Sequence, residues 1–333
     1  MSDKGNGLAS KARITAIGSY VPERVLTNVE LETMLETNDE WIIQRTGIKE
    51  RRIARPEEFT SHLCIQAIHD LLHTYNQSIE DVDLILVATA TPDFPFPSVA
   101  SRIQAAFDIP NTGAVDISAV CAGFVYGLHL ANALITSGLH QKVLVVGGET
   151  FSKIMDYTDR TSCILFGDGA GAVLIEHDNT KPSFLSFHLG SKGEGGVHLY
   201  QTGLANQMDG KALKDTKCLV QNGREVYKWA VSTVPAGMKD TLAKISFPLH
   251  DVDWFIPHSA NMRMIESICE RSGFPLSKTL TSLEYFGNTS AASIPLALHA
   301  GVRSGKVKAG ERILLYGFGG GLVHGGLLIE WNI

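Results

Sequence analysis

The chain has 333 residues, of which 44% are hydrophobic and 19% are charged, and its formal net charge at pH 7 is −6. This composition is typical of a globular protein with a large core, built as two domains or as one domain with two similar halves. The mild acidity and the lack of a long Lys/Arg run argue against a nucleic-acid partner. No segment resembles a transmembrane helix, and the polar start of the chain is unlike a signal peptide, so we expect a cytoplasmic protein with no membrane partner.

Continuous apolar runs alternate with glycine-rich turns and amphipathic segments in the first half of the chain. The run at 85–90 precedes a segment at 121–138 that has the pattern of an amphipathic helix, and further apolar runs follow at 142–148 and 170–176. Such runs are typical of buried strands, so we predict mostly parallel sheets covered by helices. The polar, glycine-rich stretch at 181–220 is interpreted as the connection between two halves together with an excursion.

The second half of the chain repeats landmarks of the first. Three landmarks recur in the same order at nearly the same offset. The acidic tripeptide DVD begins at 81 and at 251, a helix with a small-residue start that ends in Ser-Gly begins at 121 and at 290, and an apolar strand begins at 143 and at 313. Chance similarity between βα units is the weaker explanation of three ordered matches. We therefore predict an α/β fold of two duplicated halves, 1–180 and 181–333, packed face to face.

Cys121 stands where an apolar strand gives way to the helix at 121–138. Free backbone N–H groups and the positive end of the helix dipole favour a thiolate there, so we predict a lowered thiol pKa and a nucleophile. The small residues Ala119, Ala122 and Gly123 are predicted to leave room for a substrate. Free cysteines are often buried core residues, which is the alternative. The five cysteines have no CxxC or zinc-like spacing, so we expect neither disulfides nor a bound metal.

Pseudo-symmetry between the halves would bring two polar residues to Cys121. His258 ends the apolar strand DWFIP, where a histidine faces a site more readily than solvent, and Asn288 precedes the second-half helix, where a helix N-cap is the alternative. The glycine run at 317–321 is either a tight turn or a place where backbone N–H groups approach a ligand closely.

These motifs together resemble the β-ketoacyl-acyl-carrier-protein synthase III family, whose members have the thiolase-like fold. The resemblance covers nearly the whole chain, with small departures at Ser259 and His324. It implies a layered αβαβα arrangement. The motifs that carry it are TNDEWIIQRTGIKERRIA from Thr37, DISAVCAGFVYGL around Cys121, TDRTSCILFGDGAGAVLIE from Thr158, IPHSAN around His258, YFGNTSAASIPLAL around Asn288 and GFGGGLVHGG from Gly317.

The resemblance also implies an activity, namely the decarboxylative condensation that initiates type II fatty acid synthesis. Cys121 would attack a short-chain acyl-CoA, while the backbone N–H groups of Cys121 and Gly320 hold the oxyanion. His258 and Asn288 would then stabilise, as neutral donors, the enolate formed when malonyl-acyl-carrier protein loses carbon dioxide. The overall similarity favours branched primers such as isobutyryl. No cofactor is expected, because acyl-CoA is a substrate.

The resemblance assigns four further residues to coenzyme A. Trp41, Arg45 and Arg160 would lie at the adenine and its phosphates, since an indole and a guanidinium can sandwich a purine and arginine pairs with phosphate. Asn261 would line the pantetheine channel. Taken alone, Trp41 would be interpreted as a packed helix residue and the two arginines as surface ion pairs.

Two more residues are assigned to macromolecular contacts. Phe96, in the loop DFPFPS, would cross a homodimer interface to line the acyl pocket of the partner, with ordinary loop packing as the alternative. Arg263 would meet the acidic carrier protein. The partners implied are therefore acyl-CoA, malonyl-acyl-carrier protein and a second copy of the chain.

Related enzymes with other site residues fit less well. A thiolase needs a second cysteine in the C-terminal glycine loop, and this loop has none. Elongating synthases have two histidines, where this chain has a histidine and an asparagine. Hydroxymethylglutaryl-CoA synthase uses a glutamate as general acid/base, and no residue here stands out as its match. Polyketide synthases similar to chalcone synthase use the same three residues and are the main alternative. A cysteine acyl-CoA hydrolase, with His258 as general base, and a non-catalytic binding protein are the alternatives from other classes.

Overall fold

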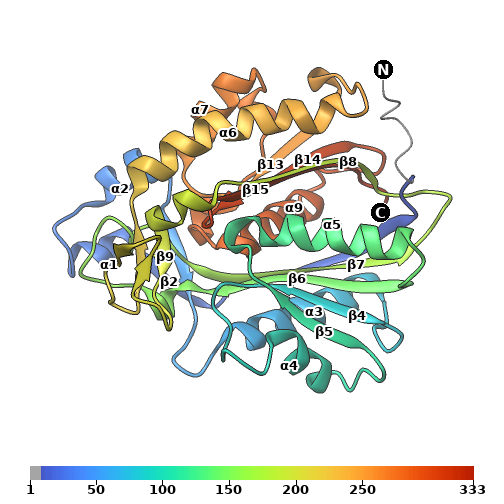
Figure 1. Cartoon of the computed structure of the whole chain (residues 1–333), viewed down its shortest axis with the longest axis horizontal. Helices are drawn as coiled ribbons and strands as arrows, with labels where there is room; N and C mark the ends of the chain where they lie inside the picture. The colour runs from blue at the N-terminus through green and yellow to red at the C-terminus, as the bar shows by residue number, and fades with distance from the viewer. Residues whose placement is uncertain (1–8) are drawn as a thin grey trace.

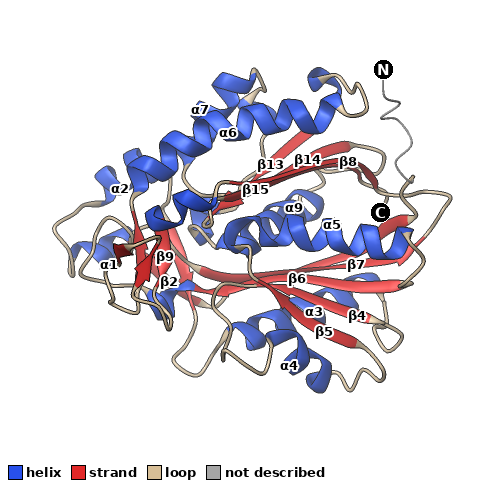
Figure 2. Cartoon of the chain, in the orientation of Figure 1, coloured by secondary structure: helices blue, strands red, loops and turns tan. Residues whose placement is uncertain are grey.

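The computed structural model describes residues 9–333, in which two β-sheets lie one above the other with helices between them and on both outer faces (Figures 1 and 2). The polar start of the chain lies mostly outside the described residues. The first sheet has the order β1 (Ala12–Tyr20), β7 (Asp168–His177), β6 (Lys142–Thr150), β4 (Leu84–Ala88), β5 (Gly113–Ile117), and the second β13 (Trp254–Pro257), β14 (Arg312–Gly319), β15 (Val323–Glu330), β8 (Phe184–Ser191).

Three pairs of helices complete the five layers. One pair covers the outer face of the first sheet, one covers the outer face of the second, and the third lies between the sheets, where its apolar side chains share a core with both (Figure 2). The predicted αβαβα arrangement is thus confirmed. The pairs are α3 (Thr60–Tyr75) with α4 (Val99–Ala106), α6 (Gly223–Ala243) with α7 (Met262–Ser272), and α5 (Gly123–Thr136) with α9 (Ser293–Arg303).

The strand directions differ from the prediction of mostly parallel sheets. Strands β5, β4 and β6 are parallel, as are β13 and β14, but β7, β1, β15 and β8 all pair antiparallel with their neighbours. The reason is local for β14 and β15, because only residues 320–322 separate them and a connection that short forces a hairpin. Each sheet is therefore mixed.

The internal duplication is visible in the backbone. Val120 and Ser290, 170 residues apart, both have left-handed φ angles of 44° and 48°, and each begins a short 3₁₀ turn that continues into α5 or α9. The turns are η1 (Val120–Ala122) and η6 (Ser290–Ala292). In this register Ala291 is the counterpart of Cys121. The strands of the first sheet lie within 12–177 and those of the second within 184–330, while the domain boundary at 180 stays a prediction.

The interpretation of 181–220 as a connection is wrong for its first part, because β8 is a strand of the second sheet, paired with β15. As an edge strand it is only half buried, so its sequence shows no apolar run. The rest of this stretch forms small ribbons. The remaining elements are β2 (Arg24–Thr27), β3 (Glu50–Ile53), β9 (Leu199–Gln201), β10 (Gln207–Met208), β11 (Lys211–Ala212), β12 (Leu219–Gln221), α1 (Asn28–Glu32), α2 (Asp39–Thr46), α8 (Leu283–Phe286), η2 (Phe151–Ile154), η3 (Gly193–His198), η4 (Leu249–Asp251) and η5 (Leu276–Lys278).

Among residues 9–333, none of the helices combines the length and the hydrophobicity that crossing a membrane requires. No group of three or more His, Cys, Asp and Glu side chains in this range is arranged to hold a metal ion.

Candidate active site

Cys121 lies between the two halves, in the turn η1 that follows β5, and is only 4% exposed. The end of β14 packs directly against it. A Cβ atom on Gly319 would lie 2.7 Å from the Cys121 Cβ and 2.9 Å from its Sγ, and one on Gly317 would lie 2.7 Å from the Ala122 Cα. The glycine run therefore allows a strand of the second half to reach the turn that carries the thiol.

The small residues after Cys121 serve packing rather than substrate. Ala122 is fully buried, and a Cβ on Gly123 would come within 2.8 Å of the Ala88 side chain. The prediction that Ala122 and Gly123 leave room for a substrate is wrong, because this turn is pressed between the two sheets, and Ala119 does not line the cavity either. Val120 and Cys121, in contrast, do line a cavity.

The prediction of a lowered thiol pKa is also wrong. Burial raises the pKa of Cys121 to about 12, because a thiolate loses its hydration there, and the charge of Glu149 adds to the effect. Hydrogen bonds from the Ser290 hydroxyl and from the backbone N–H groups of Cys121 and Gly320 act in the opposite direction without overcoming it. These two N–H groups point at the sulfur, and the resemblance assigned the same pair to an oxyanion.

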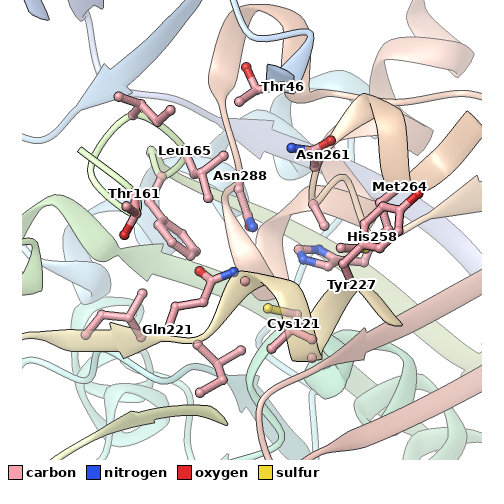
Figure 3. A pocket seen from close by; sticks show the side chains of 18 of the residues that line it. Thr46, Cys121, Thr161, Leu165, Gln221, Tyr227, His258, Asn261, Met264 and Asn288 are labelled. Atoms are coloured by element: carbon pink, nitrogen blue, oxygen red, sulfur yellow. The ribbon is translucent and has the colours of Figure 1, made fainter. Parts of the chain in front are cut away.

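His258 lies just after β13, 2% exposed, beside Cys121 on the cavity floor (Figure 3). Burial lowers the pKa of the imidazole to about 3, so the ring is neutral near pH 7. Its Nδ1 lies 2.8 Å from the hydroxyl of Ser293, which is also 2.8 Å from the carbonyl oxygen of Ser290. The hydroxyl can accept from Nδ1–H while donating to this carbonyl, or rotate and donate to Nδ1, which places the proton on Nε2.

Asn288 is held so that its amide nitrogen faces the same floor (Figure 3). Its Oδ1 accepts the backbone N–H of Ser290 at 2.9 Å, which leaves the NH₂ group as a donor toward the cavity. The Asn288 backbone pairs with Leu165 and Gly167 on the loop before β7. Asn288 is not the N-cap of α9, which begins after Ala292.

These three side chains lie at the inner end of a cavity of about 310 Å³ (Figure 3). Trp41, Arg45, Arg160 and Asn261 also line it, so the structure brings together seven of the predicted site residues. The side chains between these polar groups are mostly apolar, namely Val120, Phe151, Ile164, Leu165, Phe166, Leu199, Leu219, Val226, Met264 and Phe318.

The arginines near Trp41 lie against its indole. The guanidinium carbons of Arg45 and Arg160 lie 5.6 Å and 5.5 Å from the centre of the indole ring, and Arg160 donates to the Glu36 carbonyl at 2.6 Å. Among the described residues, neither guanidinium forms an ion pair with a carboxylate. The ion-pair interpretation of these two arginines is therefore wrong.

Asn261 caps α7 and ties it to α2, since its Oδ1 accepts the Arg263 N–H at 2.9 Å and its Nδ2 donates to the Arg45 carbonyl at 3.0 Å. Arg263 lies outside the main cavity, in a neighbouring cavity of about 480 Å³ that shares Arg45, Tyr227 and Asn261 with it. Arg224 and Glu266 line the same outer cavity, so three arginines and one glutamate surround it.

Phe96 does not line the cavity of its own chain. It is 85% exposed in the loop between β4 and α4. The alternative for Phe96 was ordinary packing within its loop, and it is wrong because the side chain is largely exposed.

Sequence reasoning missed three polar groups near the thiol and one arginine of the outer cavity. Ser290, Ser293, Glu149 and Arg224 were not singled out, although both serines lie inside the motif YFGNTSAAS. The available signal for Glu149 was a carboxylate directly after the apolar run 143–148 within β6.

Comparisons with known proteins agree with this geometry. A family model described as 3-oxoacyl-[acyl-carrier-protein (ACP)] synthase III matches residues 115–193, and the model of its C-terminal part matches residues 242–331. The β-ketoacyl-[acyl-carrier-protein] synthase III 2 of Halalkalibacterium halodurans is 64% identical over 97% of this chain and 98% of the relative. The chain belongs to the 3-oxoacyl-[acyl-carrier-protein] synthase III family.

Other family members extend the match. A relative of the same name from Bacillus subtilis is 57% identical over 97% of this chain and 100% of the relative. The crystal structure of the synthase III from Thermus thermophilus superposes with a TM-score of 0.92 at 43% identity, covering 96% of this chain and 99% of that one. The thiolase-like fold and the membership in a family of condensing enzymes are therefore established for this chain.

Proposed function

We propose that this chain condenses a short-chain acyl-CoA with malonyl-acyl-carrier protein, giving β-ketoacyl-acyl-carrier protein, coenzyme A and carbon dioxide, as the first condensation of type II fatty acid synthesis. The observation that carries the proposal is the meeting of Cys121, His258 and Asn288 at the inner end of one largely apolar cavity. Membership in the synthase III family, shared over nearly the whole chain, supports it.

In the first half-reaction the Cys121 sulfur forms a bond to the acyl carbon, and the bond from this carbon to the coenzyme A sulfur breaks. The carbonyl oxygen becomes an oxyanion in between. The N–H groups of Cys121 and Gly320 already point at the sulfur, and donors placed where negative charge develops lower the barrier. The acyl group is then held as a thioester on Cys121.

In the second half-reaction malonyl-acyl-carrier protein loses carbon dioxide, and the electron pair moves onto the thioester oxygen. The Asn288 NH₂ group is oriented to donate to this enolate by the bond that fixes its oxygen. His258 donates from Nε2 when the Ser293 hydroxyl turns to Nδ1. Both donors are neutral, so no general base is needed. The enolate carbon then attacks the acyl thioester and releases the Cys121 thiolate.

The outer end of the cavity supports the binding of coenzyme A. Trp41, Arg45 and Arg160 offer an aromatic face and two cations, which form no ion pair with any described carboxylate, for an adenine and its phosphates. A purine stacked between two flat groups needs about 7 Å. Because Arg160 lies 5.5 Å from the indole centre, we propose that this side chain moves aside when the adenine stacks on Trp41.

The entrance supports a carrier-protein partner, and the first sheet supports a homodimer. Arg224 and Arg263 join Arg45 around the outer cavity, which suits an acidic protein surface. Strand β5 is a free edge of the first sheet, and the side chains of Val115, Phe94 and Phe96 are 47%, 51% and 85% exposed. We propose that a second copy covers them and that Phe96 reaches the acyl pocket of that copy.

The primer is proposed to be a short branched acyl group. Phe151, Leu199 and Leu219 line the cavity and pack in one apolar cluster with Val120, the neighbour of Cys121, which suits an acyl chain. Competition among acetyl-, butyryl- and isobutyryl-CoA for acylation of Cys121 tests the choice. Pocket contacts of one methylene are worth about 1–3 kcal/mol. Preference for acetyl-CoA over every branched donor would contradict the branched assignment.

The activity itself is tested by the intact mass of the protein after mixing with isobutyryl-CoA and then with malonyl-acyl-carrier protein. We expect an acyl adduct that is absent from Cys121→Ala and that converts to a carrier-bound β-ketoacyl product. An adduct that yields only free acid would indicate a cysteine hydrolase. Repeated extension of the product by further malonyl units would indicate a polyketide synthase.

A further inference from the structure

A buried carboxylate lies behind the proposed nucleophile and is not used by the mechanism above. Glu149, near the end of β6, is fully buried. Its oxygens accept hydrogen bonds from the Thr91 hydroxyl at 2.6 Å, from the Ala90 N–H at 3.1 Å and from the Thr89 hydroxyl at 3.3 Å. Among residues 9–333, no Lys, Arg or His side chain lies within ion-pair distance of it. A buried carboxylate with no cation is costly, so its retention needs a reason.

Glu149 is connected to Cys121 through one hydroxyl group. Ser290 donates to the Glu149 Oε1 at 3.1 Å, and the same hydroxyl is the hydrogen-bonding partner of the Cys121 sulfur, from which its oxygen can accept the thiol proton. Ser290 begins η6, which packs against both η1, where Cys121 lies, and β6, where Glu149 lies. A hydroxyl can accept one proton while it donates another, so thiol, serine and carboxylate form a chain along which a proton can pass.

The other groups around the carboxylate do not offer the same route. Among the described residues, the charge of Glu149 affects the pKa of two thiols, Cys121 on η1 and Cys64 on α3. Its hydrogen-bonding partners come from the loop after β4, which provides threonine side chains and the Ala90 N–H, and from η6, which provides Ser290. Cys64 packs at Gly148, on the opposite face of β6. Cys64 is buried and its own pKa is raised well above the ordinary value, so it does not titrate near pH 7.

His258 is the other candidate for the thiol proton. Burial lowers the pKa of its imidazole to about 3, whereas burial raises the pKa of the Glu149 carboxyl to about 7. A general base is most effective when its pKa lies near the working pH. The carboxylate therefore suits proton removal, and His258 remains available as a donor to the enolate.

We infer that Glu149 receives the thiol proton of Cys121 through the hydroxyl of Ser290, as a positioning residue that acts on the nucleophile from behind. The inference deepens the proposed function, since it requires Cys121 to be the nucleophile.

The proton balance of the two half-reactions is complete. On acylation the S–H bond of Cys121 breaks, its proton passes to the Ser290 oxygen, and the hydroxyl proton of Ser290 passes to the Glu149 Oε1. Coenzyme A leaves as a thiolate and takes a proton from solvent. On condensation the expelled Cys121 thiolate recovers its proton from Ser290, which is reprotonated by Glu149. The cycle consumes one solvent proton, which leaves in the thiol of coenzyme A.

The test follows the alkylation of Cys121 by iodoacetamide as a function of pH, read by intact mass, in the whole protein. Alkylation needs no acyl donor, so the result does not depend on the substrate proposed above. The proton relay requires the ionised Glu149 carboxylate, so we expect the alkylation rate of the native protein to rise with pH through an inflection near 7. In Glu149→Gln and in Ser290→Ala this inflection should vanish, with rates at pH 8 lower by about 100-fold.

Two further variants separate relay from structural support. Thr89→Val removes a hydrogen bond to the Glu149 carboxylate that is not part of the relay. Because this bond stabilises the ionised carboxylate, its loss should raise the pKa of Glu149, so the inflection should remain and move to higher pH. The double variant Glu149→Gln, Ser290→Ala should lose no more than either single variant, because both act in one chain. Thermal unfolding checks that each variant is folded, and Ser290→Ala keeps the test decisive if Glu149→Gln does not fold.

Two results would overturn the inference. One is an inflection near pH 7 that persists in both Glu149→Gln and Ser290→Ala. The other is faster alkylation of Glu149→Gln at neutral pH, because a carboxylate that acts only by its charge raises the thiol pKa and its removal would free the thiolate.

Discussion

Replacing Gly319 by alanine would place a methyl group against the proposed nucleophile. Gly319 is the last residue of β14, and the added Cβ would lie 2.7 Å from the Cys121 Cβ and 2.9 Å from its Sγ. Carbon atoms in contact normally lie about 3.5–4.0 Å apart. The Cys121 side chain would therefore have to retreat by about 1 Å, away from the N–H groups that point at its sulfur.

This displacement should lower both the unfolding free energy of the protein and the rate of Cys121 acylation. Forcing an extra methyl group into a packed interior costs about 1–3 kcal/mol of unfolding free energy. A misplacement of a reacting group by about 1 Å costs about 100-fold in rate. We expect Gly319→Ala to fold, with unfolding free energy lowered within this range, and to be acylated by a short acyl-CoA about 100-fold more slowly.

Rapid-mix intact mass gives the acylation rate, and urea unfolding gives the stability. Gly203→Ala is the matched control, because a Cβ at Gly203 meets no atom within 4 Å and Gly203 lies on the loop after β9. This control should match the native protein in both measurements. Native acylation by Gly319→Ala would refute the claim that the glycine run fixes the position of the thiol.

Cys121→Ala should form no acyl adduct, whereas His258→Ala and Asn288→Ala should acylate yet release carbon dioxide from malonyl-acyl-carrier protein about 100-fold more slowly; normal release by both would exclude the enolate role. Ser293→Ala, which removes the Nδ1 partner, should slow the same release about 10-fold and spare acylation; an equal loss in both steps would contradict this. Phe96→Ala should admit longer acyl-CoA primers about 10-fold better in competition assays, and an unchanged primer profile would argue against its place in a partner's pocket.

The sequence patterns were sufficient for two α/β halves packed face to face and for the convergence of the three polar side chains, while the five layers came from the family resemblance. The apolar runs found β4, β6 and β7, and the offset of 170 residues related the halves. Strand direction could not be predicted the same way, because an apolar run has the same composition in either direction. Strand β8 was missed since an edge strand buries only part of its side chains, so its residues resemble a loop.

The chemistry of the thiol was harder to predict than its position. The helix start near Cys121 is a local feature, whereas its burial depends on closure by β14, whose glycines come from nearly 200 residues later in the chain. Burial outweighs the local field, so the pKa rises where local reasoning predicted a fall. The contact between Ser290 and Glu149 joins residues 141 positions apart, and neither residue type alone indicates it.

The duplicated turn shows how one site can come from two similar halves. Each half begins a 3₁₀ turn with a left-handed residue, at Val120 and Ser290, and each turn lies against the other half. Cys121 is the second residue of the first turn, while its counterpart Ala291 has no reactive group. The second turn instead has a hydroxyl at Ser290, where the first has the apolar Val120 that lines the cavity. Because the turns meet, the hydroxyl of one lies beside the thiol of the other, and divergence at these two positions is enough to create a nucleophile and its hydrogen-bonding partner.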